Sequence, residues 1–222
     1  MSIPGHSILP VVEADLPTLT EFLQASKLQL AINRFLFKDW PAVSAQRANS
    51  RAAVESGLRD PQTNSLKVVN DSSGIIVAHL FLTRHSSSNS ETRSTSSSGK
   101  AAEKESQSQV QVPQSMVPAV LETVRDAMRE LKPEFDGDYI ELTHIYVEPS
   151  SRNQGIGTQL VQVCRDRARA DGLPLTICAE PNHHDFFLKR GFRDTKHVDI
   201  DLRHWAPEHN GYGIFRVSRM DM

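Results

Sequence analysis

The feature that most constrains this chain is a strand, a glycine turn and a helix in direct succession. Residues 138–149, "DYIELTHIYVEP", have the apolar pattern of a strand that ends at its proline. "RNQGIG" follows at 152–157, and apolar residues at helical spacing come after it. Glycine permits positive φ and a close approach to the backbone, and a helix N-terminus presents free N–H groups. Such a turn is typical of an anion-binding site.

Two common anion-binding turns do not fit these residues. The dinucleotide fingerprint needs a third glycine at the position where this chain has Leu160. The P-loop needs Gly-Lys-Ser/Thr, which is absent. On the turn alone, a tight strand-to-helix connection that binds no ligand stays open.

Other segments alternate between strand and helix patterns. We expect strands or hairpins at 7–12, 65–84, 173–180, 196–205 and 212–220, and helices from Asp15 and at 44–58, 115–132, 155–172 and 182–192. The strand–helix–strand unit around the glycines should be parallel and right-handed, and the rest of the sheet mostly antiparallel. The predicted fold is α/β, a single domain over 1–222 with one curved mixed sheet of about six to seven strands and about four to five helices.

A serine-rich segment interrupts this pattern. Ser86–Gln109 contains ten serines and no Leu, Ile, Val, Phe, Tyr or Trp, so it has little apolar surface to offset the entropy of ordering. The elements on either side are too incomplete to fold alone. We therefore predict a low-complexity insertion at about 86–110 in a surface loop and not a domain boundary.

Charge and cysteine content argue against several classes of protein. The balance of 25 basic and 27 acidic residues gives a formal charge of −2, which predicts no nucleic-acid partner. No apolar run is long enough to span a bilayer, and the N-terminus lacks the pattern of a secretory signal. With only Cys164 and Cys178, and no H-x-x-x-H or C-x-x-C spacing, we expect neither disulfides nor a metal site. These features favour an intracellular, cytoplasmic protein, with a nuclear location and the oligomeric state left open.

Two segments together resemble a known family. "LTHIYVEPSSRNQGIGTQLV" at 142–161 is similar to motif A of the GNAT superfamily of acyl-CoA-dependent N-acyltransferases, and "FFLKRGF" at 186–192 is similar to its next signature. The resemblance implies acetyl transfer from acetyl-CoA to an amine acceptor, for which we favour a small molecule. A protein N-terminus or lysine as acceptor, and a non-catalytic acyl-CoA-binding domain, stay open.

The same resemblance implies where acetyl-CoA binds. Its pyrophosphate should lie on the backbone N–H groups of 154–158, and its pantetheine should run beside 145–147, where the central parallel strands of the family diverge. The residues expected to bind the cofactor are Ile145, Tyr146, Val147, Arg152, Asn153, Gln154, Gly155, Ile156, Gly157, Thr158, Asn182 and Phe187.

Acetyl transfer needs a base that deprotonates the acceptor amine, and the resemblance assigns this role to Glu141. His144 is the alternative, because an imidazole needs little tuning near neutral pH. Strict alternation along a strand would put Glu141 and His144 on opposite faces. A bulge in this strand would change that relation.

Phe187 departs from the pattern of the family. Many relatives carry a tyrosine at this position, which acts as the general acid that protonates the leaving thiolate. Three accounts stay open: the thiolate leaves unassisted, His183, His184 or Tyr212 replaces the tyrosine, or the protein is not a catalyst. Cys178 as a covalent nucleophile is disfavoured, because a cysteine in an apolar strand is more often a buried small hydrophobe.

The resemblance also places two other segments at the border of the acceptor site. One is "RFLFKDW" at 34–40, and the other is the last hairpin loop, with His204, Trp205, Glu208 and Tyr212. We expect some of these side chains to line the acceptor site, although an aromatic-rich connection of this kind is more often part of a core.

Overall fold

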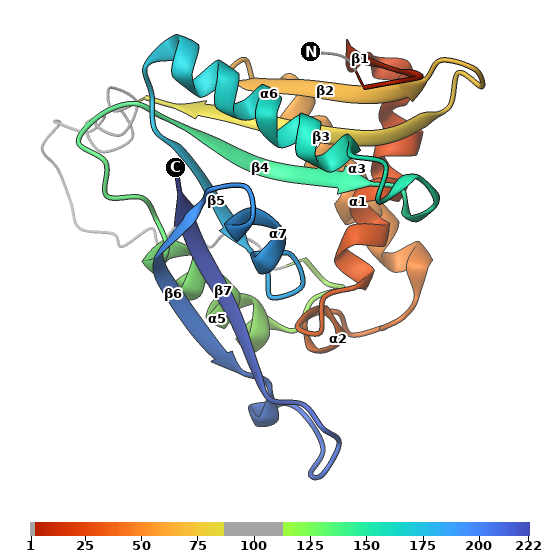
Figure 1. Ribbon diagram of the computed structural model, residues 1–222. Helices are drawn as coiled ribbons and strands as arrows, with labels where there is room; N and C mark the ends of the chain where they lie inside the picture. Colours follow the sequence, from red (N-terminus) through yellow and green to blue (C-terminus); the bar gives the residue numbers. More distant parts are fainter. Residues whose placement is uncertain (1–2, 87–112) are drawn as a thin grey trace, which may run out of the picture.

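The computed structural model describes residues 3–86 and 113–222, so the insertion predicted at about 86–110 lies almost entirely outside the described residues. Seven strands form one mixed sheet in the order β1-β2-β3-β4-β5-β7-β6 (Figure 1). The strands are β1 (His6–Pro10), β2 (Thr63–Asn70), β3 (Ile76–His85), β4 (Tyr139–Val147), β5 (Leu175–Ala179), β6 (Arg193–Asp201) and β7 (Ile214–Asp221). This architecture confirms the predicted α/β fold with a mixed sheet.

Six α-helices and three short 3-10 turns accompany the sheet within the described residues. They are η1 (Glu13–Asp15), α1 (Leu16–Leu28), α2 (Asn33–Leu36), α3 (Val43–Arg59), α5 (Pro118–Glu130), η2 (Pro149–Ser151), α6 (Ile156–Asp171), α7 (His184–Leu188) and η3 (Leu202–His204). In Figure 1, α6 covers one face of the β1–β4 half, α1 and α3 cover the other, and α5 lies against β6 and β7. There is one α-helix more than expected, because α2 is a single turn in a segment predicted as a connection.

The helix α6 illustrates why the sequence forms these elements. Its buried residues include Ile156, Leu160, Cys164 and Ala168, which recur at helical spacing and pack against the sheet as predicted. Gly172 ends the helix with φ of 65°, a left-handed conformation that glycine adopts without strain.

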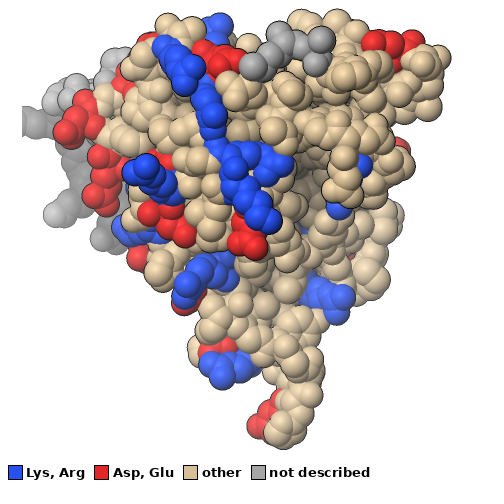
Figure 2. All heavy atoms as spheres, viewed as in Figure 1, with Lys and Arg blue, Asp and Glu red and all other residues tan. Residues whose placement is uncertain are grey.

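The face of the molecule seen in Figure 1 carries charges of both signs. Figure 2 shows a line of basic side chains that crosses the middle of this face, with acidic side chains beside it. On α6, for example, Arg167 Nε lies 3.0 Å from Asp171 Oδ2. Charges that are mixed in this way produce no extended field of one sign over this face.

The directions of the strands follow the prediction. β4 and β5, which α6 connects, run parallel, and the remaining pairs of neighbouring strands are antiparallel. The first hairpin turns between Asn70 and Gly74 as expected, and the Gly74 N–H donates to the Asn70 carbonyl at 2.8 Å.

The two parallel strands separate soon after they meet. β4 and β5 pair only at Ile140 with Leu175 and at Glu141 with Thr176, although both strands continue beyond these residues. Past these pairs no ladder joins β4 to β5, so the backbone groups along the gap are open to another partner. The divergence that the resemblance implied is therefore present.

Thr143 forms a bulge in β4. Phe81 of β3 pairs with His144, whereas the next residue, Leu82, pairs with Leu142. One residue of β4 is thus additional at this point, which interrupts the regular alternation of its side chains.

The bulge changes the expected relation between the two candidate bases. Directly paired residues on neighbouring strands point to the same face, and residues two apart on a strand share a face. Thr83, which pairs with Glu141, lies two residues from Phe81, which pairs with His144. Glu141 and His144 therefore point to the same face of the sheet, and the expectation from strict alternation is wrong.

Candidate active site

The two glycines of the turn have different physical roles. Gly155 caps the N-terminus of α6 with φ of 82°, and a Cβ added there would meet nothing within 4 Å. Glycine is therefore required at position 155 for its backbone conformation and not for lack of space. Gly157 lies in the first turn of α6, where a Cβ would come within 3.1 Å of Phe186 Cζ. Here glycine is needed because an aromatic side chain of α7 packs directly on the helix.

Arg152 ties the turn to the end of β4. Its Nε donates to the Val147 carbonyl at 3.0 Å, and its guanidinium lies 5.8 Å from the centre of the Tyr146 ring. These contacts fix the path of the chain between the strand and the helix, so Arg152 holds the loop in position.

A cavity of about 450 Å³ lies beside the glycine turn, between β4, α6 and α7. Of the twelve residues predicted to bind the cofactor, eleven line this cavity; Gln154 does not, and its Nε2 donates to the Ser150 carbonyl at 3.5 Å. We refer to this space as the cofactor cavity, because the residues expected to bind the cofactor line it. Further lining residues are Ser26, Lys27, Gln29, Leu142, Thr143, His144, Ser151, Ile177, Cys178, Glu180, His183, Phe186 and Arg190.

Arg190 is a residue of this cavity that the sequence reasoning missed. It donates to Thr158 Oγ1 at 2.6 Å and to the Phe186 carbonyl at 2.7 Å, and its guanidinium stacks 3.5 Å from the centre of the Phe186 ring. These contacts hold a positive charge beside the N-terminus of α6. The helix dipole and the guanidinium together favour a phosphate group there.

A second cavity, of about 510 Å³, lies on the other side of the point where β4 and β5 diverge. Most of its lining is apolar: Leu23, Leu30, Ile32, Leu36, Phe37, Ala53, Met116, Val124, Ala127, Met128, Leu142, Ile200, Phe215 and Val217. Its polar and ionisable lining residues include Lys27, Asn33, Glu141 and Glu180. We refer to this space as the acceptor cavity, because Glu141 and Phe37, which are expected near the acceptor, line it.

The two cavities meet at one place. Lys27, Leu142, Thr143, Cys178 and Glu180 line both of them. Four of these residues belong to β4, to β5 or to the residue that follows β5, so the common boundary lies where the two parallel strands separate. A group bound on one side can therefore react with a group bound on the other.

Glu141 lies in the acceptor cavity, and His144 does not. The Glu141 side chain is 21% exposed, and its Oε2 lies 2.8 Å from His85 Nε2. His144 lines the cofactor cavity, and burial together with the nearby His79 lowers its pKa well below the usual range. A base for an incoming amine must reach the acceptor, so the geometry favours Glu141.

Glu180 and Lys27 were not among the predicted site residues, although both line the two cavities. Burial opposes ionisation of Glu180, but the His183 side chain and the charge of Lys27 outweigh it, so the pKa of Glu180 is lowered. The signal that could have identified Glu180 is its place directly after β5, since the carboxyl ends of neighbouring parallel strands meet at one edge of a sheet.

Cys178 lies at the boundary of the two cavities but does not carry the properties of a nucleophile. Burial raises the pKa of its thiol to about 12, and the carboxylate of Glu141 acts in the same direction. A thiol with this pKa is protonated at neutral pH, and the thiolate is the nucleophilic form. The structure therefore gives no support to Cys178 as a covalent nucleophile.

The aromatic residues expected near the acceptor divide into two groups. Phe37 lines the acceptor cavity. Phe35 instead packs edge-on against Tyr212, with ring centres 4.9 Å apart, and lies 6.5 Å from Trp205. This cluster joins α2 to the last hairpin loop, so it is a structural anchor next to the cavity.

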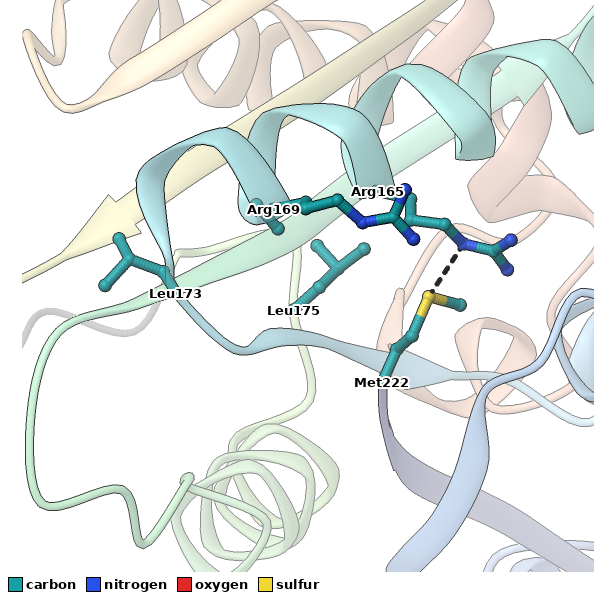
Figure 3. A pocket seen from close by; sticks show the side chains of 6 residues that line it. Arg165, Arg169, Leu173, Leu175 and Met222 are labelled. Carbon is teal, nitrogen blue, oxygen red and sulfur yellow. Dashed lines mark hydrogen bonds between the residues drawn. The ribbon is translucent and has the colours of Figure 1, made fainter.

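A further hollow of about 350 Å³ lies far along α6 from the glycine turn (Figure 3). It is bounded by Arg165, Arg169, Leu173, Leu175 and Met222, and a hydrogen bond joins Arg165 Nε to Met222 Sδ at 3.1 Å. Among the described residues, no side chain that lines this hollow is a carboxylate or an imidazole. The candidate site is therefore the pair of cavities at the divergence of β4 and β5.

Residues 122–194 match the family model of the acetyltransferase (GNAT) domain. This segment contains β4, the glycine turn, α6, β5 and α7, which build most of the cofactor cavity. This part of the chain thus matches a GNAT acetyltransferase domain, which confirms the resemblance seen in the sequence. No curated protein matches the chain.

Solved structures of acetyltransferases share the fold. A putative arylalkylamine N-acetyltransferase 7 from the yellow fever mosquito has a TM-score of 0.58 at 16% identity, over 98% of this chain and 86% of that chain. A mutant of agmatine N-acetyltransferase has a TM-score of 0.61 at 13% identity, over 98% and 99%. A protein of Corynebacterium glutamicum described as histone acetyltransferase HPA2 and related acetyltransferase has a TM-score of 0.56 at 18% identity, over 96% and 95%. At these identities the likeness establishes the fold and not the acceptor.

Within residues 3–86 and 113–222, no helix combines the length and the apolar character needed to cross a membrane.

Proposed function

We propose that the protein transfers the acetyl group of acetyl-CoA to the primary amine of a small acceptor with an apolar body. The observation that carries this proposal is the acceptor cavity itself. It is apolar over most of its lining and has the carboxyl groups of Glu141 and Glu180 in its wall. The carboxylates would complement the ammonium group of an acceptor, and the apolar lining residues would complement its apolar body.

Acetyl-CoA binding is supported by the glycine turn and its surroundings. The free N–H groups at the start of α6 and the guanidinium of Arg190 would hold the phosphates. Residues Ile145–Val147 line the cofactor cavity along the diverging edge of β4, so they can pair with the amides of the pantetheine. Unpaired N–H groups at this edge can also stabilise the negative charge that develops on the thioester oxygen.

Glu141 is proposed as the base. It accepts a proton from the ammonium group of the acceptor, and the neutral amine then attacks the carbonyl carbon of the thioester. The new C–N bond forms, the C–S bond breaks, and the second amine proton is lost as the amide forms. A positioned base of this kind contributes about 10²–10⁴-fold to the rate.

The size and composition of the acceptor cavity favour a small molecule over a peptide. A lysine side chain or a protein N-terminus would bring polar backbone into a cavity lined mainly by Leu, Ile, Val, Met and Phe. Polar amide groups without hydrogen-bond partners are costly in such a setting. Two of the similar structures are named for small amines, and one is named for histones, so the names alone do not decide between these acceptors.

The test is the release of CoA from acetyl-CoA with three classes of acceptor: apolar primary amines, polyamines, and peptides with a free N-terminus or lysine. We expect turnover with the apolar amines and much slower turnover with the other two classes. Preference for peptides or polyamines would contradict the proposed acceptor. Tight acetyl-CoA binding without turnover in all three classes would favour an acyl-CoA-binding protein.

A further inference from the structure

The chain lacks the usual proton donor for the leaving thiolate. At the position where the similar family carries tyrosine, Phe187 is buried and packs against Phe186 and Phe192, with ring centres 5.0 and 5.5 Å away. A phenyl ring has no proton to donate. Any general acid must therefore be another side chain that reaches the cofactor cavity.

Two of the three alternative donors, His184 and Tyr212, contact groups outside the cofactor cavity. His184 Nε2 lies 2.8 Å from Asp194 Oδ2 of β6. The Tyr212 hydroxyl accepts a hydrogen bond from Arg34 at 2.8 Å, in the aromatic cluster at the last hairpin loop. Neither residue lines the cofactor cavity. His183 and His184 are thus adjacent in the sequence but lie in different environments.

His183 lies close to Phe187 in the cofactor cavity. It precedes Phe187 by one helical turn, since the Phe187 N–H donates to the His183 carbonyl at 3.3 Å, so both side chains share one face of α7. Both line the cofactor cavity. The His183 side chain is 43% exposed, which leaves its ring accessible.

Glu180 supports the ring of His183 from the end of β5. Its Oε2 lies 3.6 Å from His183 Nδ1, and the His183 N–H donates to the Glu180 carbonyl at 3.0 Å. A carboxylate that faces Nδ1 orients the ring and leaves Nε2 free to donate. Glu180 also lines the boundary of the two cavities, so the pair stands beside the reacting groups.

We propose that His183 donates the proton to the leaving sulfur of CoA, with Glu180 as its positioning residue, in place of the tyrosine that this chain lacks. The inference rests on the proposed acetyl transfer. When the C–S bond breaks, its electron pair stays on sulfur, the proton moves from His183 Nε2 to that sulfur, and CoA leaves as the thiol. The neutral ring then takes up a proton from solvent, so His183 is unchanged after each turnover.

The other ionisable side chains that line the cofactor cavity with His183 are Lys27, His144, Tyr146, Arg152, Cys178, Glu180 and Arg190. Lys27, Arg152 and Arg190 are cationic, and Glu180 is the one carboxylate among the described residues that line this cavity. Glu180 is thus the carboxylate of this cavity that can orient the His183 ring.

The experiment measures kcat against pH with the best acceptor for the wild type, His183→Gln, the double variant His183→Gln/Phe187→Tyr, and His184→Gln as the matched control. A required acid makes the rate fall at high pH, as the acid loses its proton. We expect His183→Gln to lower kcat at neutral pH by about 10-fold to 10²-fold. In this variant kcat should no longer fall at high pH. The expected decrease in kcat is modest for the loss of a general acid, because a thiolate is a fair leaving group. The double variant should regain most of kcat, with the fall moved toward the ordinary pKa of tyrosine, near ~10.

Acetyl-CoA binding, followed by the rise in melting temperature, should be unchanged in His183→Gln, and His184→Gln should match the wild type in every measurement. An unchanged kcat–pH profile in His183→Gln would overturn the proposal, as would a change confined to the KM for acetyl-CoA. A double variant with no recovery would also overturn it. If the wild type turns over no acceptor, the proposed function fails first and takes this inference with it.

Discussion

The cofactor cavity and the acceptor cavity are of similar size but are built in different ways. Apart from residues 26–29, the lining of the cofactor cavity comes from 142–158 and 177–190, which form one strand–helix–strand–helix unit. The acceptor cavity draws its lining from α1, α2, α3, α5, β4, β5, β6 and β7. A local motif can therefore specify the first cavity, whereas the second exists only after distant segments have packed together.

This difference also separates the kinds of interaction in the two cavities. Backbone N–H groups and the conformation of Gly155 dominate at the phosphate end of the cofactor cavity, so few substitutions are compatible with it. Apolar side chains dominate in the acceptor cavity, and such a lining can be changed in size without loss of the fold. We expect the donor to be fixed by the first cavity and the acceptor to be tuned by the second.

The largest expected effect concerns the acceptor side. Glu141→Gln keeps the size of the side chain but removes the base, so we expect kcat to fall by about 10²-fold or more while acetyl-CoA still binds. The wild-type rate should rise with pH through one base ionisation, and this rise should be absent in the variant. Steady-state CoA release against pH measures both effects. The matched control is Glu13→Gln, at an exposed residue outside both cavities.

If Glu141→Gln kept the wild-type rate and pH profile, Glu141 would not be the base. Glu180 would then be the first alternative, because it is the other carboxylate in the acceptor cavity. His144 ranks below it, since burial lowers its pKa and its ring lines only the cofactor cavity.

The next effect concerns the cofactor side. Saturating acetyl-CoA at about 100-fold above its Kd stabilises the folded state by about 2.7 kcal/mol, which corresponds to roughly 5–10 °C in Tm for a chain of this size. Gly155→Val should abolish this rise, because valine resists positive φ and its side chain would cover the N–H groups of the turn.

Gly172→Val is the matched control for Gly155→Val. Gly172 has φ of 65° at the opposite end of α6, and no atom lies within 4 Å of a Cβ built there. Both variants carry the same backbone strain, but only Gly155→Val should lose the acetyl-CoA response. A full response in folded Gly155→Val would contradict the assignment of the phosphate site.

A smaller effect is expected from narrowing the acceptor cavity. Ala53 is exposed on α3 and lines this cavity, whereas its neighbour Ala52 is exposed and does not. Ala53→Trp should raise the KM for a bulky apolar amine by about tenfold and change that for a small amine little, since steric exclusion in an apolar pocket is worth ~1–3 kcal/mol. Ala52→Trp should leave both KM values unchanged. Equal behaviour of the two variants would show that acceptors do not occupy this cavity.

The last effect is on stability and concerns His79 and the neighbouring His144. Burial lowers the pKa of His79 to about 3, and it lowers the pKa of the neighbouring His144 as well. Below about pH 6.5 the unfolded chain binds protons that the folded chain does not, so stability is full above this pH and is lost as pH falls toward 3. Each such histidine contributes a slope of about 1.4 kcal/mol per pH unit in that window.

Urea unfolding between pH 5 and 7 measures this slope. His79→Leu should make it shallower by the contribution of one histidine, whereas His197→Gln, at an exposed residue of β6, should keep the wild-type slope. A wild-type slope in His79→Leu would show that His79 does not stay neutral in the folded state.

The parts of the site that the sequence predicts are those fixed by local patterns. The strand that ends at Pro149, the glycine turn and the apolar stripe of α6 each follow from neighbouring residues, and eleven of the twelve expected cofactor residues lie in one cavity. Gln154 is the exception, since its side chain turns back to the carbonyl of Ser150.

The parts that the sequence does not predict depend on registration between distant segments. The bulge at Thr143 results from the pairing of β4 with β3, and no residue type marks it in the sequence. Glu180 and Lys27 line both cavities because β5 diverges from β4 and the end of α1 reaches the gap. The apolar wall of the acceptor cavity likewise could not be recognised from the spacing of its residues, because many of them are ordinary core positions of different elements, whereas Ala53 and Met128 are exposed.

The central claim is that the acceptor is a small amine with an apolar body, and a homologous series of straight-chain primary alkylamines tests it most directly. The measurement is kcat/KM with saturating acetyl-CoA, as a function of chain length. Each buried CH₂ is worth about 0.8 kcal/mol, so we expect kcat/KM to increase by about fourfold per methylene until the cavity of about 510 Å³ is filled, and then to level off or fall. A value that is independent of chain length, or that decreases from the shortest amine onward, would contradict the account.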